Sequence, residues 1–277
     1  MTSKSRTAPR ASAAPVITFL SDFGDRDGFV GIVKGVLLTR CPEARIVDLS
    51  HDIPPQDVTC GALVLASGVG HFPPGTVHLA VVDPGVGGER RPIAVVTPDF
   101  VLVGPDNGLL SLAVHGRADR RVYHLDRTEH VPPAAGRTFH ARDVFGPFAA
   151  MIASGTPPDR VGTEVDALET LSLPVPRRVE HVLEAQIIYV DRFGNLVSNV
   201  EPTHLADFRG QDLSVSIRGV QIAGISTHYA AVREGRPLVL WNSWGRLEIA
   251  VRNDSAARHL RARMGDRITV AVRDRRA

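Results

Sequence analysis

Short apolar runs alternate with amphipathic stretches along the first part of the chain. The apolar runs predict strands at residues 16–21, 44–50 and 77–82. Between them, residues 28–41 and 57–72 carry apolar side chains at helical spacing. Residues 92–97 and 101–104 predict two more strands around a Pro-Asp turn, and residues 143–155 predict a helix closed by Gly155. Strands that alternate with helices are typical of an α/β domain with a mainly parallel central sheet.

The pattern changes at residues 173–183, where prolines and charged residues predict a linker. Beyond it, turn residues separate short runs that predict strands at 184–191, 212–219, 237–242, 247–252 and 267–273. This spacing favours a smaller all-β domain, an antiparallel barrel or sandwich. We therefore expect a disordered tail over residues 1–15, an α/β domain over 16–172 and a β domain over 184–277.

Composition restricts the class of partner. The chain has 277 residues, 43% of them hydrophobic, and a net charge of +2 from 32 basic and 30 acidic side chains. This near-balance argues against a nucleic-acid surface. No apolar run is long enough for a membrane span, and the basic first residues lack the apolar core of a secretory signal. Two cysteines, Cys41 and Cys60, are too few for a disulfide framework, and we expect a cytoplasmic protein.

Two segments carry candidate chemistry. DPGVGGER at 83–90 places Asp83 at the end of a predicted strand, then a glycine-rich turn, then Arg90; TFHARDVFGP at 138–147 contributes His140. A carboxylate, a guanidinium and an imidazole at strand ends could hold and polarise a water molecule. That arrangement would supply a nucleophile without a metal, a cysteine or a serine. An ordinary ion pair and a packed or surface histidine are the alternative interpretation.

Other site types find less support. The DPGVGG turn is not GxGxxG and a strand follows it, so we reject a phosphate-binding loop. The histidines lack metal-ligand spacing, which predicts no metal. We expect no cofactor either. Ser21, Ser198 and Ser243 lack a nucleophile-elbow context. Asp22, at the end of the first strand, has two interpretations: a helix N-cap or turn residue, or a ligand-binding carboxylate.

Six separated motifs, in order, carry a resemblance over nearly the whole chain. They are SDFG (21–24), DPGVGGER (83–90), GPDNG (104–108), TFHARDVFGP (138–147), DRFGN (191–195) and NSWGRLEIAV (242–251). The chain resembles the S-adenosylmethionine hydroxide adenosyltransferases, the hydrolase branch of the superfamily that also holds fluorinating and chlorinating enzymes. The resemblance implies hydrolysis of S-adenosyl-L-methionine to adenosine and L-methionine by attack of an activated water on ribose C5′.

The resemblance also implies site residues. Asp83, Arg90 and His140 would act on the water, and Asp22 would bind the ribose diol. In the second domain it implies a set of substrate contacts: Asp191 for the ammonium, Phe193, Asn195 and Tyr229 at the adenine, and Ser243 for the carboxylate. The alternatives without a ligand are a hairpin turn for DRFGN and strand packing for Tyr229.

Two alternative functions and one assembly state remain to be stated. The halogenating relatives carry a Tyr-Pro at Asp83–Pro84 and a tyrosine at His140, and the fluorinating ones a serine at Ala141, so a halogenase is the disfavoured alternative. A non-catalytic module that binds adenosine or S-adenosylmethionine is the alternative from another class. Because relatives form cyclic trimers, we expect a homotrimer with sites at subunit interfaces.

Overall fold

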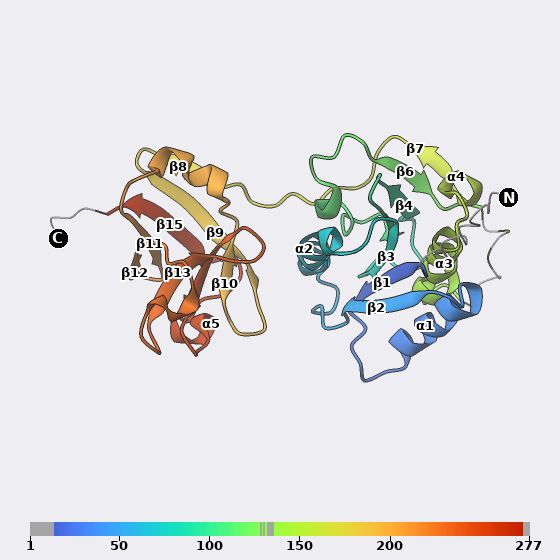
Figure 1. Cartoon of the computed structure of the whole chain (residues 1–277), viewed down its shortest axis with the longest axis horizontal. Helices are drawn as coiled ribbons and strands as arrows, with labels where there is room; N and C mark the ends of the chain where they lie inside the picture. Colours follow the sequence, from blue (N-terminus) through green and yellow to red (C-terminus); the bar gives the residue numbers. More distant parts are fainter. Residues whose placement is uncertain (1–13, 128, 130, 132–135, 274–277) are drawn as a thin grey trace, which may run out of the picture. The chain divides into compact units, whose positions relative to one another are not determined.

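The computed structural model describes residues 14–127, 129, 131 and 136–273. The chain divides into two compact units, one up to Leu171 and one from Ser172 (Figure 1). Most of the tail expected over residues 1–15 lies outside the described residues. Of its described end, the Pro15 carbonyl accepts a hydrogen bond from the Arg45 amide at 2.8 Å.

A seven-stranded sheet forms the centre of the first unit, in the order β2-β1-β3-β5-β4-β6-β7. The strands are β1 Val16–Ser21, β2 Arg45–Ser50, β3 Thr76–Val81, β4 Pro92–Val96, β5 Phe100–Pro105, β6 Arg121–His124 and β7 Thr163–Val165. Strands β2, β1, β3 and β5 run parallel, whereas β4, β6 and β7 run antiparallel to their neighbours. The sheet is therefore mixed, and the expectation of a mainly parallel sheet is only partly met.

The turn between β4 and β5 explains the difference. Thr97 closes it, because its amide donates to the Phe100 carbonyl at 3.0 Å and its hydroxyl donates to the same oxygen at 2.9 Å. A connection this short joins antiparallel strands only, since a parallel pair needs a long crossover. Strands β6 and β7 continue the antiparallel half.

Helices cover both faces of this sheet (Figure 1). They are α1 Phe29–Arg40, α2 Val58–Gly68, α3 Gly146–Ala153 and the single turn α4 Pro158–Val161. Side chains of α1 and α3 share one core cluster with Ile17, Phe19 and Leu79 of the sheet, and α2 lies on the other side. The helix expected at 57–72 ends at Gly68 and continues as a 3-10 turn, Val69–His71. Its N-cap is Asp57, which accepts from the Cys60 amide at 2.9 Å.

The second unit is a curved antiparallel sheet, as expected of an all-β domain. Its strands are β8 Arg177–Val179, β9 Val182–Val190, β10 Leu196–Ser198, β11 Leu213–Ile217, β12 Val220–Ala223, β13 Pro237–Trp241, β14 Leu247–Val251 and β15 Arg267–Val272, with α5 Ala256–His259 after β14. The order is β12-β11-β15-β9-β10-β14-β13, and β8 pairs with β9. The Ser226 amide, just after β12, donates to the Val239 carbonyl of β13 at 2.6 Å. The two edges therefore meet, and the sheet is a nearly closed barrel.

Part of the expected linker at 173–183 is strand. β8 and β9 form a hairpin in which Arg177 pairs with Glu184 and Val179 with Val182. Glu180 adopts φ 52 in the turn between them. The prolines Pro174 and Pro176 precede this hairpin and so do not interrupt it.

Two further observations concern the whole described chain. Cys41 and Cys60 are both free and buried. No helix among residues 14–127 and 136–273 is long and apolar enough to cross a bilayer.

Candidate active site

The chain reverses its direction across the sheet between β1 and β3. From β1 it passes through α1 to β2 on one side, and then through α2 to β3 on the other side. Ligands in such sheets bind in the crevice outside the carboxyl ends of the strands at this switch point. Asp22 directly follows β1 and Asp83 follows β3, and the register pairs Ser21 with Val81. Two carboxylates therefore lie at the mouth of the crevice.

Arg90 reaches the same edge because β4 returns antiparallel. Leu79 of β3 pairs with Val103 of β5, and Ile93 of β4 pairs with Gly104. The amino end of β4 thus lies at the edge where β3 ends. Gly87 permits the tight connection, since it has φ 78 and a Cβ there would meet the Arg137 carbonyl oxygen at 2.5 Å.

Asp83, Arg90 and His140 are in direct contact. The Arg90 Nε atom donates to both carboxylate oxygens of Asp83, at 2.9 and 3.0 Å, and its Nη2 atom donates to Oδ2. Nη2 also lies 2.8 Å from His140 Nδ1. The side chains of Asp83 and Arg90 are only 5% and 10% exposed. The three residues that the sequence singled out therefore form one largely buried network.

The contact with Arg90 decides which nitrogen of His140 carries the proton. A guanidinium only donates, so Nδ1 must accept and the proton of the neutral ring lies on Nε2. Burial lowers the pKa of His140, and the Arg90 charge lowers it further. His140 precedes a π-helical turn, Ala141–Phe145, at the start of α3. Phe145 packs beneath both partners, with its ring centre 5.0 Å from the Arg90 guanidinium carbon and 6.5 Å from the His140 ring.

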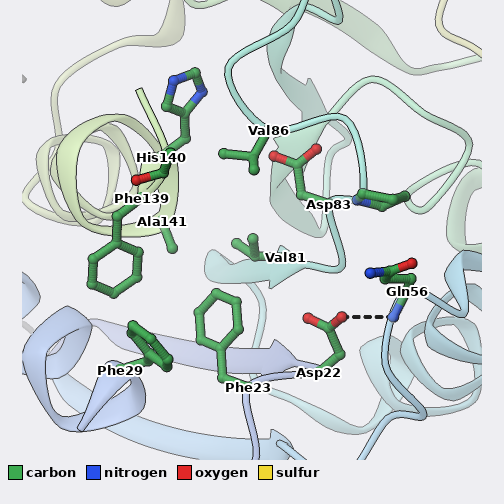
Figure 2. A pocket seen from close by; sticks show the side chains of 12 residues that line it. Asp22, Phe23, Phe29, Gln56, Val81, Asp83, Val86, Phe139, His140 and Ala141 are labelled. Carbon is green, nitrogen blue, oxygen red and sulfur yellow. Dashed lines mark hydrogen bonds between the residues drawn. The ribbon is translucent and has the colours of Figure 1, made fainter. Parts of the chain in front are cut away.

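A cavity of about 380 Å³ opens onto this network. Figure 2 shows the carboxylates of Asp22 and Asp83 on one side and the rings of Phe23, Phe29 and Phe139 on the other. The centres of the Phe29 and Phe139 rings are 5.3 Å apart, so these rings form one aromatic wall. An apolar wall facing a few convergent polar groups is typical of a small-molecule site.

Asp22 is not a helix N-cap, because Gly28 occupies that position of α1. Its Oδ2 atom instead accepts from the Gln56 amide at 2.8 Å (Figure 2). One carboxylate oxygen is thus oriented by the loop that follows β2. Asp22 is therefore not an N-cap but lies in the bend after β1, as the turn interpretation expected, and a ligand-binding role remains a prediction.

The GPDNG motif has a structural role behind the site. Asn107 Nδ2 donates to the Val82 carbonyl at 2.9 Å, which holds the residue before Asp83. Arg91 Nε donates to Asp106 Oδ2 at 2.9 Å, and the buried Asp106 also accepts from the Glu169 amide at 2.7 Å. Among the described residues, no group of three His, Cys, Asp or Glu side chains could hold a metal ion. The absence of a metal and of a cofactor remains an expectation.

The DRFGN motif forms the turn between β9 and β10. Asp191 Oδ1 accepts from the amides of Phe193 and Asn195 at 2.9 and 2.8 Å, and its Oδ2 accepts from Asn195 Nδ2 at 2.9 Å. Gly194 has φ 84, and a Cβ there would lie 2.0 Å from Ser255 Oγ. The hairpin interpretation is therefore confirmed. It does not exclude ligand contacts, since Asp191 Oδ2 keeps a further lone pair and the side-chain oxygen Oδ1 of Asn195 stays available.

A second cavity, of about 440 Å³, lies in the second unit and is lined by Phe193, Asn195 and Tyr229 together with residues 251–255 and Arg258. Phe193 is 77% exposed. Tyr229 begins a 3-10 turn, Tyr229–Ala231, so its placement in a strand was wrong. Ser243 is exposed in the turn between β13 and β14 and does not line this cavity.

Sequence reasoning missed Glu248. This side chain is 2% exposed on β14. Its carboxylate accepts from the Tyr229 hydroxyl at 2.8 Å and from Asn242 Nδ2 at 3.2 Å. Burial raises the pKa of Glu248. The available signal was one acidic residue within the otherwise apolar LEIAV run, which alternation alone assigns to an exposed face.

The comparisons with known proteins agree over both units. The model of the SAM hydroxide adenosyltransferase N-terminal domain matches residues 17–162, and that of the C-terminal domain matches residues 185–269. An (R)-S-adenosyl-L-methionine hydrolase of Salinispora tropica is 38% identical over 262 residues, which cover 93% of this chain and 98% of that protein. A fluorinase of an Actinoplanes species is 28% identical, over 87% of this chain and 92% of that protein.

The fold has a solved counterpart as well. The crystal structure of a conserved protein from Thermotoga maritima superimposes with a TM-score of 0.86 and 31% identity, and covers 92% of this chain and 99% of that one. The family models match both halves of the chain, and the hydrolase relative matches nearly all of it. The chain therefore belongs to the SAM hydroxide adenosyltransferase family.

Proposed function

We propose that the protein hydrolyses S-adenosyl-L-methionine to adenosine and L-methionine. The observation that carries the proposal is the buried contact of Asp83, Arg90 and His140 beside a cavity of about 380 Å³. The relative from Salinispora tropica, an (R)-S-adenosyl-L-methionine hydrolase, supports it and makes the (R) sulfonium epimer the expected substrate. No metal or cofactor takes part in the proposed step.

The step is an in-line displacement at ribose C5′. The water oxygen forms a bond to C5′, the C5′–S bond breaks, and its electron pair stays on sulfur. Because the sulfonium leaves as a neutral thioether, no acid is needed for its departure. The protein has to position the water about 3 Å from C5′ and accept its proton.

The roles within the network follow from its hydrogen bonds. His140 Nδ1 is occupied by Arg90, so the ring has no free acceptor nitrogen, and its Nε2–H orients the water. Asp83 then accepts the proton at Oδ1, which accepts one hydrogen bond from Arg90 and retains a lone pair. Arg90 stabilises the developing hydroxide. Asp22 binds the ribose diol, and Asp191, Phe193, Asn195, Tyr229 and Ser243 bind the amino-acid and adenine parts.

A halogenase is the competing activity, because a fluorinase is among the relatives. Asp83 opposes it. A halide beside a largely buried carboxylate would be repelled, and like charges a few Å apart cost roughly several kcal/mol. Ala141 also offers no side-chain donor to an anion.

Product analysis in ¹⁸O-water with excess chloride or fluoride tests the proposed reaction. We expect adenosine labelled at its 5′ oxygen, an equal amount of methionine, and no 5′-halo nucleoside by liquid chromatography and mass spectrometry. A halogenated nucleoside formed at a rate near that of adenosine would make the protein a halogenase. Binding of the substrate without any product would leave only a non-catalytic module.

We also propose that the protein acts as a homotrimer in the cytoplasm, with each site shared between subunits. The proposed water-activating residues lie in the first unit and the proposed Asn195 contact in the second. Phe29 and Ile32, one turn apart on α1, stay 44% and 47% exposed, which suits a surface that a neighbouring subunit covers. The free, buried Cys41 and Cys60 suit a reducing compartment.

Complementation tests the shared sites. Asp83→Ala and Asn195→Ala chains should each be inactive as homo-oligomers, and mixed oligomers formed after reversible dissociation should recover activity. Recovery follows because some sites then combine an intact first unit with an intact second unit. Mixing two differently tagged Asp83→Ala chains is the matched control and should restore nothing. A fully active monomer in light scattering, or no recovery in oligomers shown to be mixed, would contradict the proposal.

A further inference from the structure

A chain of polar side chains lies directly behind Asp22. Ser21 Oγ is 2.8 Å from His51 Nδ1, and His51 Nε2 is 3.0 Å from Asp48 Oδ1. Lys34 Nζ completes the chain with a 2.6 Å hydrogen bond to Asp48 Oδ2. Ser21 is fully buried and His51 is 7% exposed. The mechanism proposed above uses none of these four residues.

One arrangement of protons satisfies every atom in the chain. Asp48 only accepts, because the hydrogen bonds from Lys34 and His51 outweigh the effect of burial and hold its pKa below the usual range. His51 Nε2 therefore donates to Asp48. Ser21 Oγ accepts from the Phe23 amide at 3.3 Å, so its own proton is directed at His51 Nδ1. Each polar group thus fixes the orientation of the next.

This Ser-His-Asp order does not make Ser21 a nucleophile. Its hydroxyl is inaccessible to any substrate, since the residue has no exposed surface. The hydrogen bonds act on the neighbouring backbone instead. Ser21 Oγ binds the Phe23 amide at 3.3 Å, and the His51 carbonyl accepts from the Gly24 amide at 2.9 Å. These two bonds hold the amides of the two residues that follow Asp22. The Oδ2 atom of Asp22 is itself held by Gln56 of the same 51–56 loop.

We propose that Ser21 and His51 are positioning residues that orient the Asp22 carboxylate toward the ribose hydroxyls. The inference rests on the proposed function, because it takes Asp22 as the group that binds the diol. A carboxylate holds two vicinal hydroxyls only when both of its oxygens face them, so a small rotation of the 21–24 turn weakens both bonds. Loss of the Ser21–His51 contact then acts on substrate affinity through the ribose alone.

The test compares S-adenosyl-L-methionine with its analogue that lacks both ribose hydroxyls. Ser21→Ala should raise KM for the natural substrate roughly three- to tenfold, the value of about one hydrogen bond, with little change in kcat. The same variant should leave KM for the dideoxy analogue unchanged. Ser21→Thr, which keeps the hydroxyl, should restore the wild-type ratio. His51→Phe should act like Ser21→Ala, and it keeps the edge-on ring contact with Phe19 at 4.7 Å.

The chain offers a matched control on the same strand. Thr18 Oγ1 is 2.8 Å from Nδ1 of the buried His78, a hydroxyl–imidazole contact like that of Ser21 but without any bond to the Asp22 turn. Thr18→Val should lower the unfolding temperature without changing the ratio of KM values. An equal rise in KM for both substrates in Ser21→Ala and His51→Phe would show general damage and overturn the inference, as would no rise for either.

Failure of the inference differs from failure of the proposed function. Calorimetric binding of adenosine and 2′,3′-dideoxyadenosine gives the same comparison without turnover. A wild type that binds adenosine but releases no product from S-adenosyl-L-methionine would contradict the proposed reaction, while a selective loss of adenosine affinity in Ser21→Ala would still support positioning. A wild type that does not distinguish the two nucleosides would overturn the inference even if hydrolysis is observed.

Discussion

Asp83→Asn should lower kcat by about 10²- to 10⁴-fold, the usual contribution of a positioned acid or base. The substitution keeps the size of the side chain and one acceptor oxygen for Arg90, but it removes the proton acceptor and the negative charge. Affinity for the substrate should stay close to wild type, because the carboxylate acts on the water in the proposed step. Rapid-quench measurement of adenosine, together with calorimetric binding, separates the two effects.

Stability needs a control of its own, because Arg90 is only 10% exposed. Asp83→Ala would leave its charge unpaired, and breaking a buried pair costs roughly 3–5 kcal/mol. The neighbouring Arg91–Asp106 pair is the matched comparison, since its carboxylate is also buried yet does not line the cavity. Asp106→Asn should lower the free energy of unfolding with a much smaller change in kcat. Near-wild-type turnover in Asp83→Asn would remove Asp83 from the mechanism.

The pH dependence of kcat/KM should show an acid limb set by His140. The proposed step needs the neutral ring, because protonation of Nδ1 would direct an N–H at the Arg90 Nη2 donor and place two cations together. Since burial and then Arg90 lower the pKa of His140, activity should stay level through neutral pH. Activity should fall about tenfold per pH unit only at low pH. The midpoint of this fall should lie below about 6.5, the ordinary pKa of histidine.

His140→Asn distinguishes this group from others that titrate. The asparagine carbonyl oxygen can accept from Arg90 in place of Nδ1, and its amide can donate to water in place of Nε2–H, but it has no proton to gain. The variant should keep part of the activity and lose the acid limb. An unchanged limb in His140→Asn would assign the titration to another residue, and a rise in activity toward acid pH would reverse the proposed sign.

The sequence predicts the elements that carry the site better than it predicts how they pair. The strands before Asp22 and Asp83 are long, apolar and followed by turn residues, so their ends are visible in the pattern. Strands β6 and β7 are short, at Arg121–His124 and Thr163–Val165, and no comparable run marks them. Without them the turn between β4 and β5 is the one visible sign of antiparallel pairing, and the first unit is expected to be more parallel than it is.

The contacts within the site also differ in how far the sequence predicts them. Asp83 and Arg90 are seven residues apart across a glycine turn, so their pairing is predictable. His140 is 50 residues from Arg90, so the residue types suggested a shared water but not this direct contact. The Ser21–His51 contact spans 30 residues and involves no motif spacing. Such contacts depend on how strands pair, which the residue pattern of one chain does not specify.

The antiparallel return of β4 has a consequence for how this scaffold can diversify. Both members of the ion pair belong to one connection, which leaves β3 after Val81 and enters β4 at Pro92. A helical crossover at this point would have carried Arg90 to the far edge of the sheet. Replacement of that single connection can therefore change both members of the ion pair while the strand order, both helical layers and the turn that contains Asp22 are inherited unaltered.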